Sequence, residues 1–313
     1  MADQRKLSGR VLVAGHRGMV GGALVRRLAA ENVEVLTLGR SDVDFVDQAA
    51  TFEAVKTLRP DVVIVAAAKV GGIHANNTQP QAFLYENIAI AQNLIEGAHR
   101  ADVNRLLFLG SSCIYPREAE QPIREEALLT GPLEPTNQWY AIAKIAGLKL
   151  AQSYRRSFGR DYISAMPTNL YGPGDNYHPE HSHVPAGLIR RFHEAKLRGD
   201  PQATVWGTGT PRREFLHVDD LADACVFLLN TYSDETALNV GVGADISIAD
   251  FARAVARTVG FEGELTFDTS RPDGTPRKLL DVSRLAALGW SARIELDDGL
   301  KGAYSDFLER GLG

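Results

Sequence analysis

Short apolar runs alternate with segments of helical periodicity along the first half of the chain. The apolar runs cover residues 10–14, 33–38, 62–68, 106–109 and 162–165. Between them, apolar residues recur at helical spacing over 23–30, 49–58 and 82–100. Short apolar runs joined by helices are typical of a parallel sheet that is covered on both faces. The pattern predicts an α/β fold with a Rossmann-type doubly wound sheet.

The second half of the chain repeats the alternation in shorter pieces. A short apolar run lies at 203–205 and a second strand candidate at 238–241. Helices are predicted at about 217–230, at 248–259, where Ser247 begins the helix, and at 299–308. Asp219 and Asp220 are expected to cap the first of these helices and to complement its dipole. The strand candidate at 238–241 predicts that the chain returns to the large sheet.

Composition narrows the class of protein. With 313 residues and 44% hydrophobic content, the chain can form one large or two modest domains. A formal net charge of -5 argues against general binding to nucleic acid or a membrane surface. No apolar run is long enough to span a membrane, and residues 1–10 lack the apolar region of a signal peptide, so we expect a cytoplasmic protein. Cys113 and Cys225 are too few for a disulfide framework.

A glycine-rich turn follows the first predicted strand. Gly15, Gly18 and Gly21 are spaced G-x-x-G-x-x-G between that strand and a helix. Glycines at this spacing allow a tight turn, close approach of the backbone to a pyrophosphate, and close packing of the helix on the strand. The phosphates would lie at the helix N-terminus, where free N–H groups and the dipole favour anions. The turn therefore predicts dinucleotide binding.

Two arginines indicate which dinucleotide is bound. The second predicted strand ends in Gly39-Arg40-Ser41, where an NAD site usually has Asp or Glu. Arginine suits the additional 2'-phosphate of NADP, and Arg17 in the glycine turn offers a second cation. Arg40 and Arg17 together predict NADPH, with Asp44 a weaker candidate neighbour of the adenine or ribose.

Tyr140 and Lys144 lie four residues apart at the start of a predicted helix. Residues i and i+4 share a helix face, so the ammonium is expected near the phenol and should lower its pKa toward the range useful for acid-base catalysis. Ser111 or Ser112, at the end of the strand 106–109, could donate to the same substrate oxygen. The pair alone is weak evidence, because a tyrosine packed under a lysine is common in helices.

Eight segments together resemble one known family. They are AGHRGMVG, AAAKVGGI, GSSCIYP, LEPTN, YAIAKIAG, MPTNLYGP, REFLHVDD and PDGTPRKLLD. The resemblance is to the GDP-L-fucose synthases, in the extended, nucleotide-sugar-modifying branch of the short-chain dehydrogenase/reductase superfamily. It covers about residues 11–290. Relatives often have Asn-Glu-Pro-Tyr where this chain has Asn137-Gln138-Trp139-Tyr140, which puts in doubt the local shape and any role of the replaced glutamate.

The resemblance implies an activity in two parts. Enzymes of this family epimerise GDP-4-keto-6-deoxy-D-mannose at carbons 3 and 5 and then reduce the carbon 4 ketone with NADPH. Epimerisation needs a base on one face of the sugar and an acid on the other, and the resemblance assigns these roles to Cys113 and His183 in an order left open. Ser111, Tyr140 and Lys144 would stabilise the oxyanion in both parts. Homodimers formed through two long helices per subunit are common in the family, and residues 82–100 and 140–158 are the candidates here.

The glycine turn, the arginines and the resemblance together assign the contacts with the ligands. Contacts with NADP are assigned to Gly15, Arg17, Gly18, Met19, Val20, Gly21, Arg40, Leu109, Gly110, Ser111, Ser112, Tyr140, Lys144, Pro167, Thr168, Asn169, Leu170 and His183. Contacts with the GDP-sugar are assigned to Arg191, Trp206, Arg213, Asp273 and Lys278. Arginines and a flat aromatic ring suit two phosphates and a guanine. Residues 1–167 are expected to form the Rossmann domain, with about 214–242 packing back onto it. Residues 168–213 and 243–313 are expected to form a smaller, discontinuous α/β substrate-binding domain.

Other functions stay open at this point. A GDP-L-colitose synthase, acting on a 3,6-dideoxy sugar, would differ in only a few pocket residues. A simple nucleotide-sugar 4-epimerase would not need Cys113 and His183, and a protein that only senses NADP would commonly lack Tyr140 and Lys144. His178, His181 and His183 have nitrogen ligands at close spacing, but the proposed chemistry needs no metal, so no metal site is predicted.

Overall fold

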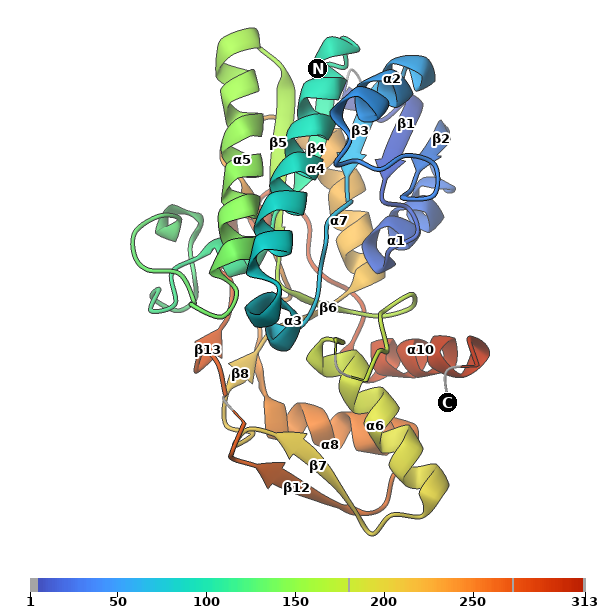
Figure 1. The fold of residues 1–313 in the computed structure, drawn as a ribbon, viewed down its shortest axis with the longest axis vertical. Coiled ribbons are helices and arrows are strands. Elements are labelled where there is room, and N and C mark those ends of the chain that lie inside the picture. Colours follow the sequence, from blue (N-terminus) through green and yellow to red (C-terminus); the bar gives the residue numbers. More distant parts are fainter. Residues whose placement is uncertain (1–4, 180, 272, 312–313) are drawn as a thin grey trace.

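Six parallel strands form the central sheet, in the order β10-β5-β4-β3-β1-β2 (Figure 1). This computed structural model describes residues 5–179, 181–271 and 273–311. The strands are β1 (Gly9–Ala14), β2 (Val33–Leu38), β3 (Val62–Val65), β4 (Arg105–Leu109), β5 (Asp161–Pro167) and β10 (Leu238–Val240). The chain leaves β1 toward β2 on one side and continues through β3 on the other, so the crevice for a ligand lies beyond the carboxyl ends of β1 and β3.

The central strands are buried on both faces because runs such as residues 11–14, 62–65 and 106–109 are apolar at consecutive positions, not at alternate ones. In β1, Val11 and Val13 pack into one core while Leu12 and Ala14 pack into the other. The same alternation holds in β3, β4 and β5, whose apolar side chains point in turn into one core and then the other and are almost fully buried. The doubly wound sheet predicted from the apolar runs is confirmed.

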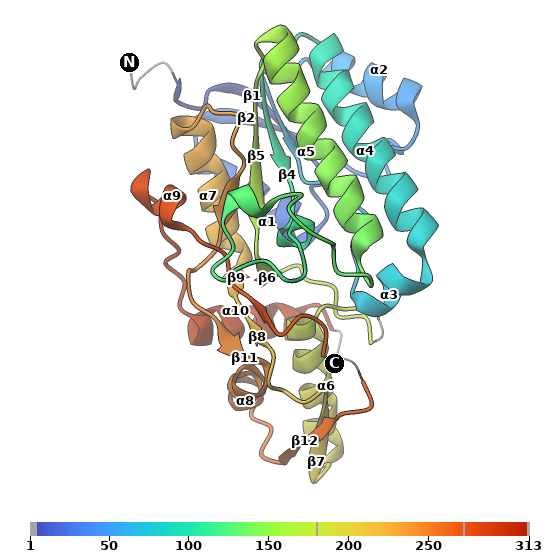
Figure 2. The same cartoon turned by 90° about the vertical axis from the view of Figure 1, so that its left-hand side faces the viewer.

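Helices cover the two faces in separate groups (Figure 2). One face carries α1 (Met19–Leu28), α7 (Val218–Thr231) and, near β10, α9 (Ser283–Ala287). The other carries α2 (Gln48–Leu58), α4 (Pro80–Arg100) and α5 (Gln138–Phe158), with α4 and α5 packed side by side. Helix α5 can lie this close to β4 because a Cβ at Gly147 would be 2.4 Å from the Phe108 ring. None of the helices in the described ranges is long and apolar enough to cross a membrane.

Several boundaries differ from those predicted. Strand β3 ends at Val65, and residues 66–72 form a loop before a short helix, α3 (Ile73–Thr78), that the pattern did not predict. Helix α1 begins at Met19, within the glycine turn and four residues earlier than predicted. The aspartates do not cap α7: the His217 side chain accepts from the Asp219 backbone N–H instead. Asp220 is buried and accepts from the backbone N–H groups of residues 293 and 294.

A smaller lobe lies below the carboxyl ends of the strands in Figure 1. Its core is formed by α6 (Val184–Arg198), α8 (Ile248–Val259) and α10 (Leu296–Glu309), together with the parallel pair β7 (Gln202–Trp206) and β12 (Glu264–Asp268). A three-stranded sheet orders β11 (Ile246–Ser247), β8 (Arg212–Arg213) and β13 (Arg277–Lys278). The pair β6 (Asn169–Tyr171) and β9 (Phe215–His217) joins this lobe to the large sheet.

The chain crosses between the two parts more than once. Leu280, Leu285 and Trp290 pack into the cores of the large sheet, although they follow the strands of the smaller lobe. Glu214 is completely buried at the crossing and accepts from the backbone N–H groups of Val242, Gly243 and Leu280. These bonds satisfy a carboxylate that would otherwise be costly to bury. The division into two domains at 167–168 and 242–243 remains a prediction.

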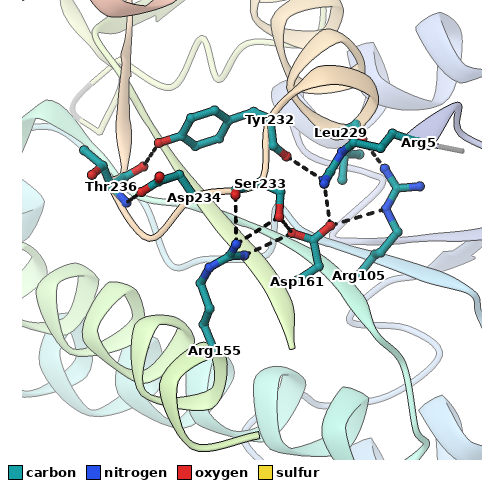
Figure 3. Close-up of polar contacts among 9 residues, drawn as sticks. All are labelled: Arg5, Arg105, Arg155, Asp161, Leu229, Tyr232, Ser233, Asp234 and Thr236. Carbon is teal, nitrogen blue, oxygen red and sulfur yellow. Dashed lines mark hydrogen bonds and ion pairs between the residues drawn. The ribbon is translucent and has the colours of Figure 1, made fainter. Parts of the chain in front are cut away.

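Asp161, at the start of β5, ties three arginines together at the edge of the sheet farthest from the crevice (Figure 3). Its carboxylate lies 2.7 Å from the Arg5 guanidinium, 3.0 Å from that of Arg155 and 3.9 Å from that of Arg105. Arg5 also donates to the carbonyl of Tyr232, after α7. One carboxylate therefore joins the N-terminal segment, two strands of the sheet, α5 and the end of α7.

Replacing Asp161 with alanine is expected to lower the free energy of unfolding by about 2–4 kcal/mol, because three partly buried arginines would lose their shared counter-ion. Chemical denaturation measures the change. Glu34→Ala is the matched control, since its ion pair with Arg10 is 62% exposed on the carboxylate side and should contribute less than about 1 kcal/mol. Equal effects of the two substitutions would contradict this account of the cluster.

Candidate active site

The glycine turn is shaped as its spacing predicts. Gly15 has φ +93°, which favours glycine, and its N–H donates to the Leu38 carbonyl of the adjacent strand. A Cβ at Gly21 would lie 2.1 Å from the Gly15 carbonyl oxygen, so α1 packs against the turn only with glycine there. Gly18 is the N-cap and makes no side-chain cap, which leaves the first N–H groups of α1 directed at the crevice. The turn fits a pyrophosphate.

Arg17 lies in the glycine turn, and Arg40 lies two residues after the end of β2. Both are exposed, and neither has an ion pair or side-chain hydrogen bond with the residues that the structure describes. Between them, Gly39 leaves room for the His16 ring, 2.9 Å from where a Cβ would be. Asp44 is exposed and accepts from the Val46 N–H. Two free guanidiniums beside the turn fit NADP better than NAD.

Tyr140 and Lys144 are on the first turns of α5, facing the end of β4. The Lys144 ammonium is 5.7 Å from the centre of the Tyr140 ring and donates to the Leu109 carbonyl over 2.8 Å. Ser111, two residues beyond β4, interacts through its side chain with the Tyr140 phenol. The serine, tyrosine and lysine predicted to act together are therefore neighbours.

The expected effect of the lysine on the tyrosine is wrong in direction. Burial raises the pKa of the Tyr140 phenol above its ordinary value, the charge on Cys113 acts in the same direction, and the interaction with Ser111 opposes them. Burial also lowers the pKa of Lys144 to about 8. The ammonium is turned toward the Leu109 carbonyl, so desolvation outweighs it at the phenol. Tyr140 is a neutral acid at neutral pH.

Cys113 lies in the same loop as Ser111, which accepts from the Cys113 backbone N–H. Its sulfur is partly exposed and faces the Asn137 amide nitrogen at 3.4 Å and the Lys278 ammonium at 3.9 Å. Cys225, by contrast, is completely buried in α7, and burial raises its thiol pKa to about 12. The prediction that Cys113 is the functional cysteine and Cys225 a core residue agrees with these surroundings.

His183 is the N-cap residue of α6, and its ring makes no cap hydrogen bond. Its side chain is exposed, yet the protein around it desolvates the ring and lowers its pKa, which favours neutral imidazole. The preceding loop lies beside the start of α3, where the Gly72 N–H donates to the His181 carbonyl. The His178 and His181 rings stack with centres 4.5 Å apart. Within the described ranges, no three His, Cys, Asp or Glu side chains are grouped to hold a metal ion.

Trp206 ends β7 and is 47% exposed, so it is not a core tryptophan. The Arg191 guanidinium lies 4.8 Å from the centre of its ring and donates to the Thr204 carbonyl. Arg271, which sequence reasoning missed, lies 5.0 Å from the same ring. An exposed indole with two guanidiniums suits a flat base with attached phosphates.

Arg213, Lys278 and Asp273 continue this surface toward Cys113. Strand pairing places Lys278 beside Arg213. The charge on Cys113 acts on Arg213, whose pKa burial nevertheless lowers. Asp273 accepts from the backbone N–H and the hydroxyl of Thr208, so it holds the turn after β7. Of the five residues assigned to the GDP-sugar, Arg191 thus contacts Trp206, Asp273 holds the turn after Trp206, and Lys278 lies between Arg213 and Cys113.

Other assigned residues have structural contacts of their own. The Asn169 amide donates to the Glu214 carbonyl over 2.8 Å, and the Thr168 hydroxyl is directed at the same oxygen. Ser112 is buried, and the Gly110 N–H donates to the Ala165 carbonyl. Pro167 ends β5, and Leu170 packs against the core under α1. The side chains of Thr168 and Asn169 are thereby directed at Glu214, just before β9, which fixes the backbone that follows β5.

Known proteins match almost the whole chain. Residues 11–241 match the model of the "NAD dependent epimerase/dehydratase family". The chain is 56% identical over 303 residues to "Putative GDP-L-fucose synthase 2" of Arabidopsis thaliana, which covers 96% of this chain and 92% of that protein. It is 54% identical over 310 residues to "GDP-L-fucose synthase" of Escherichia coli, with 96% and 97% covered. Identity to "GDP-L-colitose synthase" of Yersinia pseudotuberculosis is 35% over 301 residues, with 96% and 98% covered.

A solved structure agrees with the fold and the cofactor. The GDP-L-fucose synthetase of Naegleria fowleri bound to NADP superimposes with a TM-score of 0.90 at 29% identity, covering 97% of this chain and 94% of the other. The glycine turn and the two free arginines described above therefore belong to a fold that binds NADP in a solved structure.

Proposed function

This chain belongs to the NAD dependent epimerase/dehydratase family, and we propose that it converts GDP-4-keto-6-deoxy-D-mannose to GDP-L-fucose. The cofactor is NADPH, in keeping with Arg17, Arg40 and the NADP-bound relative. The observation that carries the proposal is the placement of Cys113 beside Tyr140, since simple reduction of a ketone would not need a second proton-transferring group there.

Reduction uses the neutral phenol of Tyr140. When bound at the glycine turn, NADPH supplies the hydride that carbon 4 of the sugar receives. The carbonyl oxygen gains negative charge as this happens, and Tyr140 donates its proton to that oxygen while the Ser111 hydroxyl donates a hydrogen bond. Lys144, with a pKa of about 8, is mainly charged at neutral pH and stabilises the tyrosinate that remains.

Epimerisation uses the same oxyanion contacts. Removal of a proton from carbon 3 or carbon 5 sends electrons to the carbon 4 oxygen, which Ser111 and Tyr140 stabilise. One of Cys113 and His183 takes the proton, and the other returns a proton on the opposite face. The partly exposed sulfur of Cys113 and the neutral imidazole of His183 are both in a state to exchange protons.

The surface from Trp206 to Lys278 would bind the GDP part. We expect the guanine to contact the Trp206 ring and the phosphates to pair with Arg191 and Arg213. Lys278, 3.9 Å from the Cys113 sulfur, marks the end where the sugar meets the loop after β4. A substrate bound along this surface would therefore present its ketone to Tyr140.

Identity above 50% to fucose synthases, against 35% to the colitose synthase, favours the 6-deoxy sugar. A spectrophotometric assay of NADPH oxidation tests the choice with each GDP-sugar in turn. We expect kcat/KM at least about ten-fold higher for GDP-4-keto-6-deoxy-D-mannose than for its 3-deoxy analogue, because unpaired polar groups in the pocket penalise the missing hydroxyl. Preference for the 3-deoxy sugar would replace the proposal with a colitose synthase.

Arg40→Ala is expected to raise KM for NADPH by about 10–100-fold and to leave kinetics with NADH almost unchanged, because only NADPH carries the phosphate that the guanidinium would pair. Initial rates against cofactor concentration measure the effect. Arg253→Ala, a surface arginine of α8, is the matched control. Equal losses with both cofactors would mean that Arg40 does not contact the 2'-phosphate.

We propose in addition that the protein acts in the cytoplasm as a homodimer. Large apolar side chains are exposed on α4 and α5, at Tyr85 (57%), Ile142 (39%) and Phe158 (59%). A second copy packed on these helices would bury them.

A further inference from the structure

The Cys113 sulfur is held by two side chains that come from distant parts of the chain. The Asn137 amide nitrogen, before α5, lies 3.4 Å from the sulfur, and the Lys278 ammonium, on β13, lies 3.9 Å from it. Both groups are donors, and an ammonium can only donate. The sulfur is therefore the acceptor in both contacts.

Asn137 contacts the Cys113 sulfur in place of the N-cap hydrogen bond that its position at the start of α5 would favour. It is the N-cap residue of α5, where an asparagine side chain usually accepts from the first turn of the helix, yet it makes no cap hydrogen bond. Its amide oxygen is buried with no hydrogen-bond partner among the described residues. The Asn137 side chain therefore contacts the Cys113 sulfur instead of capping α5, although its amide oxygen is left unpaired.

Charged and polar groups from several elements lie near the sulfur. Lys278 and Arg213 are on adjacent strands, and the Arg213 guanidinium interacts electrostatically with Cys113. The neutral phenol of Tyr140 lies close to Cys113 from α5. A small cavity beside Cys113, about the size of one water molecule, is lined also by Arg117, Glu134 and Arg277. Glu134 pairs with Arg117 at 3.4 Å, and Arg277 pairs with Asp245. Among the described residues, Lys278 and Arg213 are the cations near the sulfur that have no ion pair.

We propose that Asn137, together with Lys278, is a positioning residue that holds the Cys113 sulfur and stabilises its negative charge for proton transfer to and from the sugar. The proposal rests on the proposed function, and it deepens it. In the transfer, the C–H bond beside the ketone breaks as an S–H bond forms, or the reverse, and the electron pair moves between carbon and the carbonyl oxygen. Asn137 acts only through the sulfur, whereas Lys278 also lies at the end of the surface proposed for the GDP-sugar.

Alkylation of the full-length protein by iodoacetamide tests the positioning without any substrate. Cys225 is completely buried, so the reaction under native conditions reports Cys113, and Cys113→Ser provides the blank. The rate is followed by mass spectrometry from pH 5 to 10. We expect Asn137→Ala to move the pH profile upward and to lower the rate at pH 7 by about ten-fold. Asn137→Asp should lower it further, because a carboxylate beside the sulfur repels the thiolate.

Two more variants keep the test decisive. Asn137→Ser retains a donor and a good N-cap residue, and should recover part of the rate. Lys278→Met removes the ammonium from a strand edge and should also lower the rate at pH 7. Melting temperature and NADPH binding establish that each variant is folded. Identical pH profiles in the wild type, Asn137→Ala and Lys278→Met would overturn the proposal.

Exchange of sugar protons with heavy water then separates this inference from the proposed function. Parallel losses of alkylation and of exchange at carbons 3 and 5 in Asn137→Ala support both. A shifted alkylation profile in a protein whose wild type exchanges no sugar protons supports the positioning of the sulfur and refutes the proposed epimerisation.

Discussion

Tyr140→Phe is expected to reduce the rate of NADPH oxidation with the keto sugar by about 10²–10⁴-fold. The substitution removes one oxygen from a half-buried ring, so packing changes little, but the ketone oxygen loses its proton donor. Lys144 cannot replace the phenol, because its ammonium is bound to the Leu109 carbonyl 2.8 Å away. Steady-state rates at saturating NADPH measure the loss.

Binding of NADPH should persist in this variant, since the glycine turn and the arginines are untouched. Tyr304→Phe, which removes a phenol that bonds His193 in the smaller lobe, is the matched control and should retain full activity. If Tyr140→Phe kept most of its activity, the acid would have to be another group. A wild type that binds NADPH but turns over no keto sugar would favour the alternative of a protein that senses NADP.

Cys113→Ser is expected to lower proton exchange at carbons 3 and 5 by about 10²–10⁴-fold while NADPH oxidation falls much less. A serine hydroxyl is a far weaker acid than a thiol, so it keeps its proton at neutral pH and does not exchange it with the sugar. Ser111, Tyr140 and Lys144 remain for the reduction. Nuclear magnetic resonance of the sugar in heavy water measures exchange, and absorbance measures oxidation.

The other cysteine provides the control for this experiment. Cys225 is buried in the core on α7, so Cys225→Ala should lower the stability of the fold without changing the rate of exchange or of oxidation. Equal loss of exchange and oxidation in Cys113→Ser would contradict the separate role of Cys113, because it would mean that the sulfur serves a step common to both parts.

The large sheet could be predicted because its signals are local. Apolar runs such as Val62–Val65 are buried on both faces, Gly15 has a positive φ, and Gly21 packs against the Gly15 carbonyl within the same turn. Tyr140 and Lys144 are neighbours by helix geometry alone. Such features need only a few consecutive residues to specify them.

The smaller lobe could be predicted only in part, because its contacts are distant in the sequence. Strands β8, β11 and β13 have two residues each, too few for a period to be recognised. Arg271 meets Trp206 only through the pairing of β7 with β12. Glutamate is usually found at the surface, and the burial of Glu214 depends on three backbone N–H groups from residues 242, 243 and 280.

The electrostatics of the site were the least predictable part. The i, i+4 spacing correctly places Lys144 near Tyr140, but the direction of the tyrosine pKa shift depends on how much solvent the fold removes. Likewise, nothing in the sequence indicates that Asn137 faces Cys113 and not the first turn of α5, because the loop between residues 113 and 137 decides it.

The most direct test of the central claim follows NADPH oxidation by the purified protein with GDP-4-keto-6-deoxy-D-mannose in heavy water and then locates deuterium in the product. This account predicts oxidation of NADPH together with deuterium at both carbon 3 and carbon 5. Without the enzyme, no NADPH should be oxidised and no deuterium should enter at these two carbons. Oxidation with deuterium at neither carbon would contradict it, since the protein would then be a simple ketone reductase and Cys113 and His183 would have no part in the reaction.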